Sequence, residues 1–170
     1  MVYNPPRQQR TVGGGPGDRH PDRPGGPGGP PPAPESISQL RTLLQAKGFA
    51  DDDVMGRAEL VARDLARELS GGKGESGRTQ VRKVYNQART LKGKSQQRGF
   101  AAVRPDLRLL QAHIAYAVAR ETLGPEFKVF FDAVADRLLR MNTGAELEAF
   151  LKFFEALYAY FYFSTSKYGR

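Results

Sequence analysis

Few residues of this chain of 170 could do catalytic chemistry. It contains no cysteine, and only His20 and His113 carry an imidazole, which excludes thiol nucleophiles and zinc sites built from cysteine and histidine. Residues 93–95 read Gly-Lys-Ser and resemble the end of a phosphate-binding loop, but Ala88 stands where that motif needs its first glycine. His113 would have to act alone as a base, because His20 lies in a Gly/Pro-rich tail. We therefore predict no enzyme activity and no cofactor.

The three adjacent carboxylates of residues 51–53 are the best candidates for metal ligands. They directly precede an amphipathic run that begins at Val54. Carboxylates at the start of a helix accept hydrogen bonds from its unpaired N–H groups and favour its positive dipole end. We interpret this run as a helix cap and predict no metal site.

Positive charge is concentrated in the middle of the chain. The whole sequence has 26 Lys and Arg against 18 Asp and Glu, and residues 71–120 hold eleven of these basic residues with only Glu75 and Asp106. A block of this kind favours a polyanionic partner, most commonly a nucleic acid. The alternative is a solvated charged face that binds no ligand.

The composition divides the chain into a tail and a folded part. Residues 1–35 contain eight Gly and ten Pro and almost no apolar side chains, so we predict a disordered tail there and one folded domain over residues 36–170. The first ten residues lack the apolar core of a secretory signal, and no stretch approaches about 18 uninterrupted apolar residues. We expect a cytoplasmic protein with no membrane partner.

The folded part shows helical periodicity and no strand alternation. We predict an all-α fold, a compact bundle of five or six helices, from Ser36 as cap to Gly48, then over residues 54–69, 79–91, 104–122, 125–141 and 145–163. Thr79 is the predicted N-cap of the third helix, and Met141 belongs to the apolar face of the fifth. The last helix is apolar around most of its girth, so it must be enclosed by the core or by a partner subunit.

The predicted third helix carries basic residues beside its apolar face. At about 100° per residue, Arg78, Arg82 and Arg89 fall on one stripe, and Lys83 lies further round the helix. Lys92, Lys94 and Arg98 follow in a predicted loop. This array is suited to tracking the phosphates of a nucleic acid.

Three short motifs resemble a known family. They are Thr-Gln-Val-Arg-Lys-Val-Tyr at 79–85, His-Ile-Ala-Tyr-Ala-Val-Ala-Arg at 113–120 and Phe-Glu-Ala-Leu-Tyr-Ala-Tyr at 154–160. In this order and spacing they resemble the small helical subunit of type III-A CRISPR effector (Csm) complexes, over roughly residues 53–168. The family departs from this chain in often having Lys where His113 stands and a His-Lys pair where this chain has Phe161-Tyr162.

The resemblance implies a non-catalytic antiviral subunit that stacks in several copies along guide RNA and single-stranded target RNA, beside the backbone subunit. It makes Arg82, Lys83 and Arg120 the first candidates for contact with the RNA backbone. Charge geometry adds a second set of RNA-binding candidates: Arg78, Arg89, Lys92, Lys94 and Arg98. The alternatives are a helical DNA-binding regulator or nucleoid-type protein that uses helix 79–91 in a major groove, a small nuclease or a subunit of one, and a pure scaffold.

Overall fold

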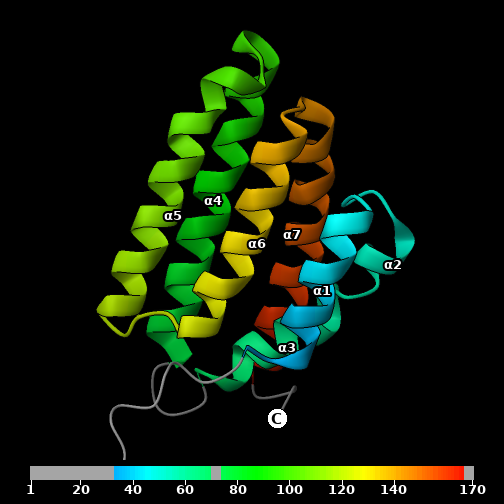
Figure 1. Cartoon of the computed structure of the whole chain (residues 1–170). Helices are drawn as coiled ribbons and strands as arrows, with labels where there is room; N and C mark the ends of the chain where they lie inside the picture. Colours follow the sequence, from blue (N-terminus) through cyan, green and yellow to red (C-terminus); the bar gives the residue numbers. More distant parts are fainter. Residues whose placement is uncertain (1–32, 70–73, 167–170) are drawn as a thin grey trace, which may run out of the picture. The chain divides into compact units, whose positions relative to one another are not determined.

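The computed structural model describes residues 33–69 and 74–166, and all regular structure in these ranges is helical. The α-helices are α1 (Glu35–Ala46), α2 (Asp52–Met55), α3 (Ala58–Arg67), α4 (Gly74–Arg98), α5 (Arg104–Ala119), α6 (Pro125–Met141) and α7 (Gly144–Ser164), and a 3-10 turn, η1, spans Phe100–Val103 (Figure 1). Six of these helices have ten or more residues, which confirms the all-α prediction. The disordered tail was predicted over residues 1–35, and positions 1–32 of it lie outside the described residues.

The bundle is built around α7. Helix α7 packs against α3, α4 and α6, whereas α5 packs against α4 and α6, and α1 against α6 (Figure 1). Phe150, Phe153, Phe154 and Phe161 of α7 are fully buried, so the prediction that the core encloses this helix is confirmed for most of its length. Its exposed aromatic side chains, Tyr160, Tyr162 and Phe163, all lie in its last turns.

The predicted limits of the third helix are wrong at both ends. Helix α4 begins at Gly74, so Thr79 is not its cap, and it continues to Arg98, so Lys92, Lys94 and Arg98 are helical. The apolar face continues past the buried Leu91 to the buried Ser95, and this face packs on α7, α5 and η1. Tertiary packing therefore outweighs the low helix propensity of the glycines that suggested loops.

The first two predicted helices also need correction. Ser36 does not cap α1, because the helix begins one residue earlier, at Glu35. Ser36 is instead buried, and its hydroxyl group donates a hydrogen bond to the Asp64 carboxylate (2.6 Å). The run 54–69 divides into α2 and α3 around Gly56. The carboxylate of Asp51 accepts a hydrogen bond from the N–H of Asp53 (3.0 Å), which confirms the predicted capping role.

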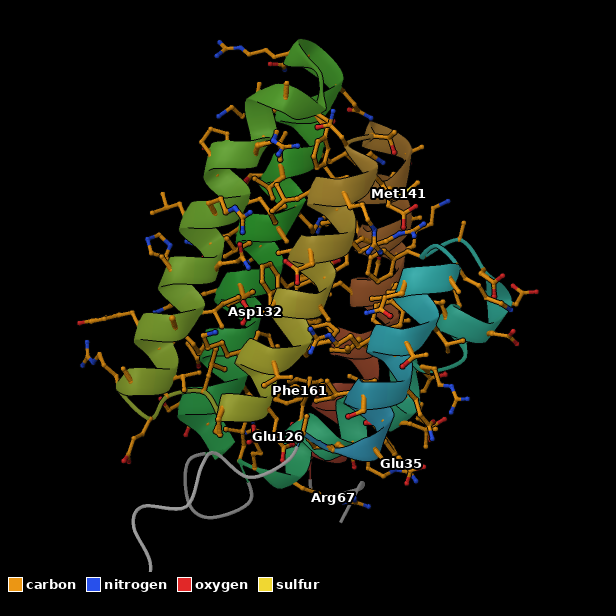
Figure 2. The ribbon with its side chains drawn as sticks, viewed as in Figure 1. Glu35, Arg67, Glu126, Asp132, Met141 and Phe161 are labelled. Atoms are coloured by element: carbon orange, nitrogen blue, oxygen red, sulfur yellow. The ribbon has the colours of Figure 1, made fainter. Side chains whose placement is uncertain are left out.

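The predicted inward position of Met141 is wrong. Its side chain is 40% exposed at the last residue of α6 (Figure 2), where the helix ends and its face leaves the core. Asn142 follows with a left-handed backbone (φ 55°), and Thr143 then caps α7 by accepting a hydrogen bond from the N–H of Glu146 (3.2 Å).

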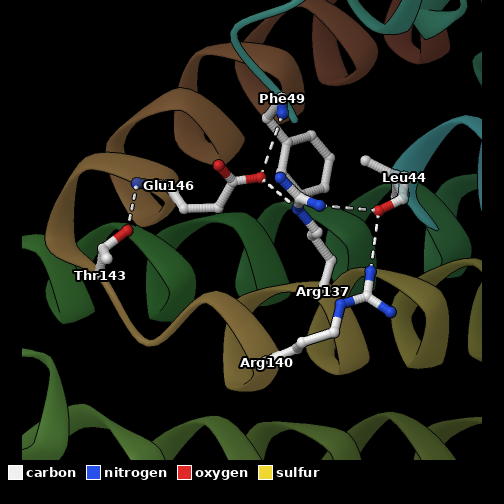
Figure 3. Close-up of polar contacts among 6 residues, drawn as sticks. All are labelled: Leu44, Phe49, Arg137, Arg140, Thr143 and Glu146. Atoms are coloured by element: carbon white, nitrogen blue, oxygen red, sulfur yellow. Dashed lines mark hydrogen bonds and ion pairs between the residues drawn. The ribbon is translucent and has the colours of Figure 1, made fainter. Parts of the chain in front are cut away.

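A polar network joins three distant segments near Gly48 (Figure 3). Arg137 donates to Glu146 (2.8 Å) and to the carbonyl oxygen of Leu44 (3.1 Å), and Glu146 also accepts a hydrogen bond from the N–H of Phe49 (3.2 Å). A Cβ on Gly48 would lie 3.0 Å from both the Arg137 guanidinium and the Glu146 carboxylate. A side chain at position 48 would therefore crowd this network. The C-cap of α1, predicted at Gly48, is Lys47.

Two carboxylates meet where α3 ends and α6 begins. Glu68 accepts a hydrogen bond from the N–H of Glu126 (3.2 Å), and burial raises the pKa of Glu68. Burial, followed by repulsion from Glu68 and Asp64, raises the pKa of Glu126 from 4.5 to about 7. A raised carboxyl pKa means that the folded chain holds a proton that the unfolded chain releases.

Glu126→Gln is therefore expected to raise Tm at pH 8 and to leave it nearly unchanged at pH 4. At pH 4 the carboxyl group is mostly protonated in both states, so an amide changes little; as pH rises through about 7 the folded chain must carry the charge. Thermal unfolding followed by circular dichroism at both pH values measures this difference. Asp136→Asn, on the exposed side of the same helix, is the control, and an equal gain at both pH values would contradict the assignment.

Candidate nucleic-acid interface

Helix α4 presents its basic residues between α5 on one side and α7 on the other. Successive residues turn by about 100°, and Val81, Val84 and Ala88 occupy the buried side. The cations occupy the remaining arc, with a group at each flanking helix and Arg82 on the solvent face between them. The structure therefore divides the predicted basic face into two edges of a single helix.

The edge beside α5 brings together two of the three motif-based candidates. Lys83 and Arg120 line a hollow of about 360 Å³ between α4 and α5, together with Tyr116. The Arg120 guanidinium lies 5.6 Å from the centre of the Tyr116 ring, and that ring is 62% exposed. An exposed ring with a fixed guanidinium can stack on a base while the charge holds a phosphate.

Arg82 occupies the solvent face of α4 between the two edges. It is exposed and makes no hydrogen bond or ion pair with the residues that the structure describes. Arg98 is likewise exposed in the last turn of the helix. Both side chains are available to an external anion.

The edge beside α7 holds Arg78 and Arg89. Arg78 donates to the carbonyl oxygen of Thr165 (3.2 Å) and lies over the ring of Tyr162 (6.0 Å), and Arg89 lies over the ring of Tyr85 (5.7 Å). These contacts orient the guanidinium groups without neutralising their charge. Both arginines remain candidates for phosphate contact.

The remaining two candidates are paired with carboxylates. Lys92 contacts Glu148 (2.8 Å), and its hydrogen bond is the main cause that lowers the Glu148 pKa. Lys94 contacts Asp106 (2.6 Å). Their charges are partly neutralised within the chain, so they are weaker candidates than Arg82, Lys83 and Arg120.

Lys152 is a basic residue that the sequence interpretation did not place in the site. It lies on the exposed side of α7 and lines a second hollow with Arg89. Glu148, Lys152 and Glu155 visibly interrupt the most apolar part of the sequence, but the surrounding aromatic residues indicated a core helix, so this polar row was not assigned to the site. The spacing of that row, four and then three residues, was the signal that could have revealed it.

No group of three or more metal-ligating side chains occurs in the described part of the chain. Among the same residues no helix is long and apolar enough to cross a membrane. His113 is exposed on α5 and borders a small hollow with Leu109 and Gln87. Cations and aromatic rings, in contrast, line the α4 surface, and this composition suits an anionic polymer.

A family model described as Csm2 Type III-A matches residues 52–167. The chain belongs to this family. The matched range contains all of α4, α5 and α7 and also Arg120, which directly follows α5, so it includes every candidate residue above. It agrees with the range over which the three motifs indicate the resemblance. No curated protein and no solved structure matches the chain.

Membership of the Csm2 family makes the chain a small subunit of the type III-A CRISPR effector complex, a multi-subunit Csm assembly. The Csm2 subunit is non-catalytic, as the sequence predicted. Family membership therefore assigns the chain to this complex and not to the alternative functions of a DNA-binding regulator or a nuclease. Helix α1 precedes the matched range and is an element of this chain that the family model does not cover.

Proposed function

We propose that this Csm2-family subunit binds the phosphate backbone of guide RNA and single-stranded target RNA through the exposed face of α4 and the end of α5. The observation that supports it is the arrangement of Arg82, Lys83 and Arg120, which come from two helices, are exposed, and make no ion pair with a described carboxylate. Arg120 lies over the Tyr116 ring, and Lys83 and Arg120 both line the polar hollow between α4 and α5.

In this proposal the subunit recognises backbone charge and leaves sequence to base pairing. Phosphate contacts fix position without reading bases, so binding tolerates any target that pairs with the guide. The RNA-binding domain is residues 36–170, and several copies stack along the RNA beside the backbone subunit in the cytoplasm. Repetition of a weak contact along one strand gives a high overall affinity.

The triple variant Arg82→Gln, Lys83→Gln, Arg120→Gln tests the proposal in a reconstituted complex loaded with guide RNA. Each phosphate contact contributes about 0.7 to the slope of log K against log salt for a single strand, so each copy of the variant should reduce the slope by up to about 2. Fluorescence anisotropy with labelled target RNA at several salt concentrations measures the slope. An unchanged slope would remove these residues from the interface.

The matched control removes three charges elsewhere. Arg41, Arg63 and Arg67 are exposed on α1 and α3, so their replacement by glutamine changes net charge equally without touching α4. The control is expected to retain the slope of the native complex. Competition between duplex DNA and single-stranded RNA adds a second test, because a preference for duplex DNA would contradict an RNA interface.

A further inference from the structure

Gly93 lies in the interior of α4 without a packing reason in the fold. Glycine is the least favourable residue in a helix interior after proline. A Cβ on Gly77 would collide with the Leu69 side chain, which explains that glycine, but a Cβ on Gly93 would meet nothing within 4 Å. The folded chain would therefore accept a side chain at position 93.

Gly93 also lines a hollow of about 380 Å³ between α4 and α7. Four residues of each helix complete the lining, namely Tyr85, Arg89, Lys92 and Gln96 of α4 and Glu148, Leu151, Lys152 and Glu155 of α7. A side chain at position 93 would enter space beside this hollow. A glycine there leaves the helix backbone open to the close approach of another molecule.

The charges of the hollow favour an anion. Lys92 and Glu148 form an ion pair at 2.8 Å, and Lys152 acts on the same Glu148 carboxylate through its charge, but neither Arg89 nor Lys152 makes an ion pair of its own with a described carboxylate. The Arg89 guanidinium is held over the Tyr85 ring, which itself stacks on Tyr158 with centroids 5.2 Å apart. The lining therefore holds three cations, Arg89, Lys92 and Lys152, against two carboxylates, and its net charge is positive.

We propose that a phosphodiester group of the RNA lies in this hollow over Gly93, held by Arg89 from α4 and Lys152 from α7. The inference rests on the proposed function and extends the interface from α4 and α5 onto a third helix, α7. The absence of a side chain allows the strand to reach the α4 backbone, and the two cations then flank the phosphate. Gly93 is in this account a positioning residue, and Lys152 is a contact residue.

Gly93→Ala and Gly93→Gln test the close approach, because folding and binding should change in opposite directions. Alanine and glutamine both favour a helix over glycine, so Tm of the isolated chain should rise by about 2–4 °C. In the reconstituted complex, affinity for labelled target RNA should fall about threefold for alanine and tenfold or more for glutamine. Neither substitution changes charge, so each remaining phosphate contact should contribute the same amount to the slope of log K against log salt.

Ala46→Gln is the matched control for size. It adds a comparable side chain to an exposed helical position at the end of α1. It should leave RNA affinity unchanged. A Gly93→Gln complex that binds target RNA as tightly as the native complex would overturn the proposal.

Charge substitutions test the two groups that face the phosphate. Lys152→Gln should weaken RNA binding several-fold and reduce the salt slope by about 0.7 per copy, whereas Glu155→Gln should strengthen binding about twofold by removing repulsion. Lys128→Gln, on α6, removes the same charge from a pair with Asp132 and should change neither quantity. Lys152→Gln with native affinity and slope would remove α7 from the interface.

The same measurements separate this inference from the function on which it rests. If the triple variant at Arg82, Lys83 and Arg120 also leaves RNA affinity unchanged, RNA binding by this subunit is itself wrong. If the triple variant weakens binding but the Gly93 and Lys152 variants do not, only the hollow is wrong. If Gly93→Gln expels the subunit from the complex without changing RNA affinity, a protein neighbour occupies the hollow and the RNA proposal is overturned.

Discussion

Arg137→Met is expected to lower the free energy of unfolding by about 3–5 kcal/mol, because it leaves the buried carboxylate of Glu146 without its cation. Both side chains are about 10% exposed, and their contact joins α6 to α7 while Arg137 also holds the last turn of α1 through the Leu44 carbonyl oxygen (Figure 3). Urea unfolding of the full chain, followed by circular dichroism, measures the loss.

The double variant Arg137→Met, Glu146→Met separates the ion pair from simple packing. It removes both charges, so it should be more stable than Arg137→Met alone, although the N–H of Phe49 then loses its acceptor. Arg140→Met is the control, since Arg140 bonds the same carbonyl oxygen (2.9 Å) from an exposed position and should cost much less. Equal losses for Arg137→Met and Arg140→Met would contradict the role of burial.

The helical architecture could be predicted because its apolar residues recur at the helical period. Apart from Met141, the buried faces of α5, α6 and α7 follow from the spacing of apolar residues, and Pro105 and Pro125 mark the first turns of α5 and α6. The limits of α4 could not be predicted, since Gly77 and Gly93 resemble loop residues; packing on Leu69 explains Gly77, and nothing in the fold requires Gly93. Helical periodicity also could not predict the network around Arg137, because its hydrogen bonds to Leu44 and Phe49 span 93 and 97 positions of the sequence.

The basic surface could be predicted in composition but not in arrangement. The charge block and the motifs identified the cations of α4 and Arg120, and the structure places most of them at two edges of α4, with Arg82 between the edges. Sequence could not show that Lys92 and Lys94 are paired, because Glu148 is 56 positions and Asp106 12 positions away. Nor could it bring Lys152 beside Arg89, since that proximity depends on how α7 packs against α4.

Phe150→Ala is the substitution expected to cost most in the apolar core, at about 3–5 kcal/mol of unfolding free energy. Its ring is fully buried and contacts three others, those of Phe49 (5.2 Å), Phe154 (5.4 Å) and Phe131 (6.3 Å). Alanine would leave a cavity bounded by elements that the Arg137 network also fixes, so the walls cannot easily collapse. Urea unfolding of the full chain again gives the loss.

Phe163→Ala makes the same chemical change on the same helix at a position where the ring is 58% exposed. It should change the unfolding free energy by no more than about 0.5 kcal/mol, because little apolar contact is lost. The two phenylalanines are alike in the aromatic run of the sequence, and only their position relative to α3, α4 and α6 separates them. If both substitutions destabilise the chain equally, the last turns of α7 are covered by a contact that the described residues do not show, and the helix is enclosed along its whole length.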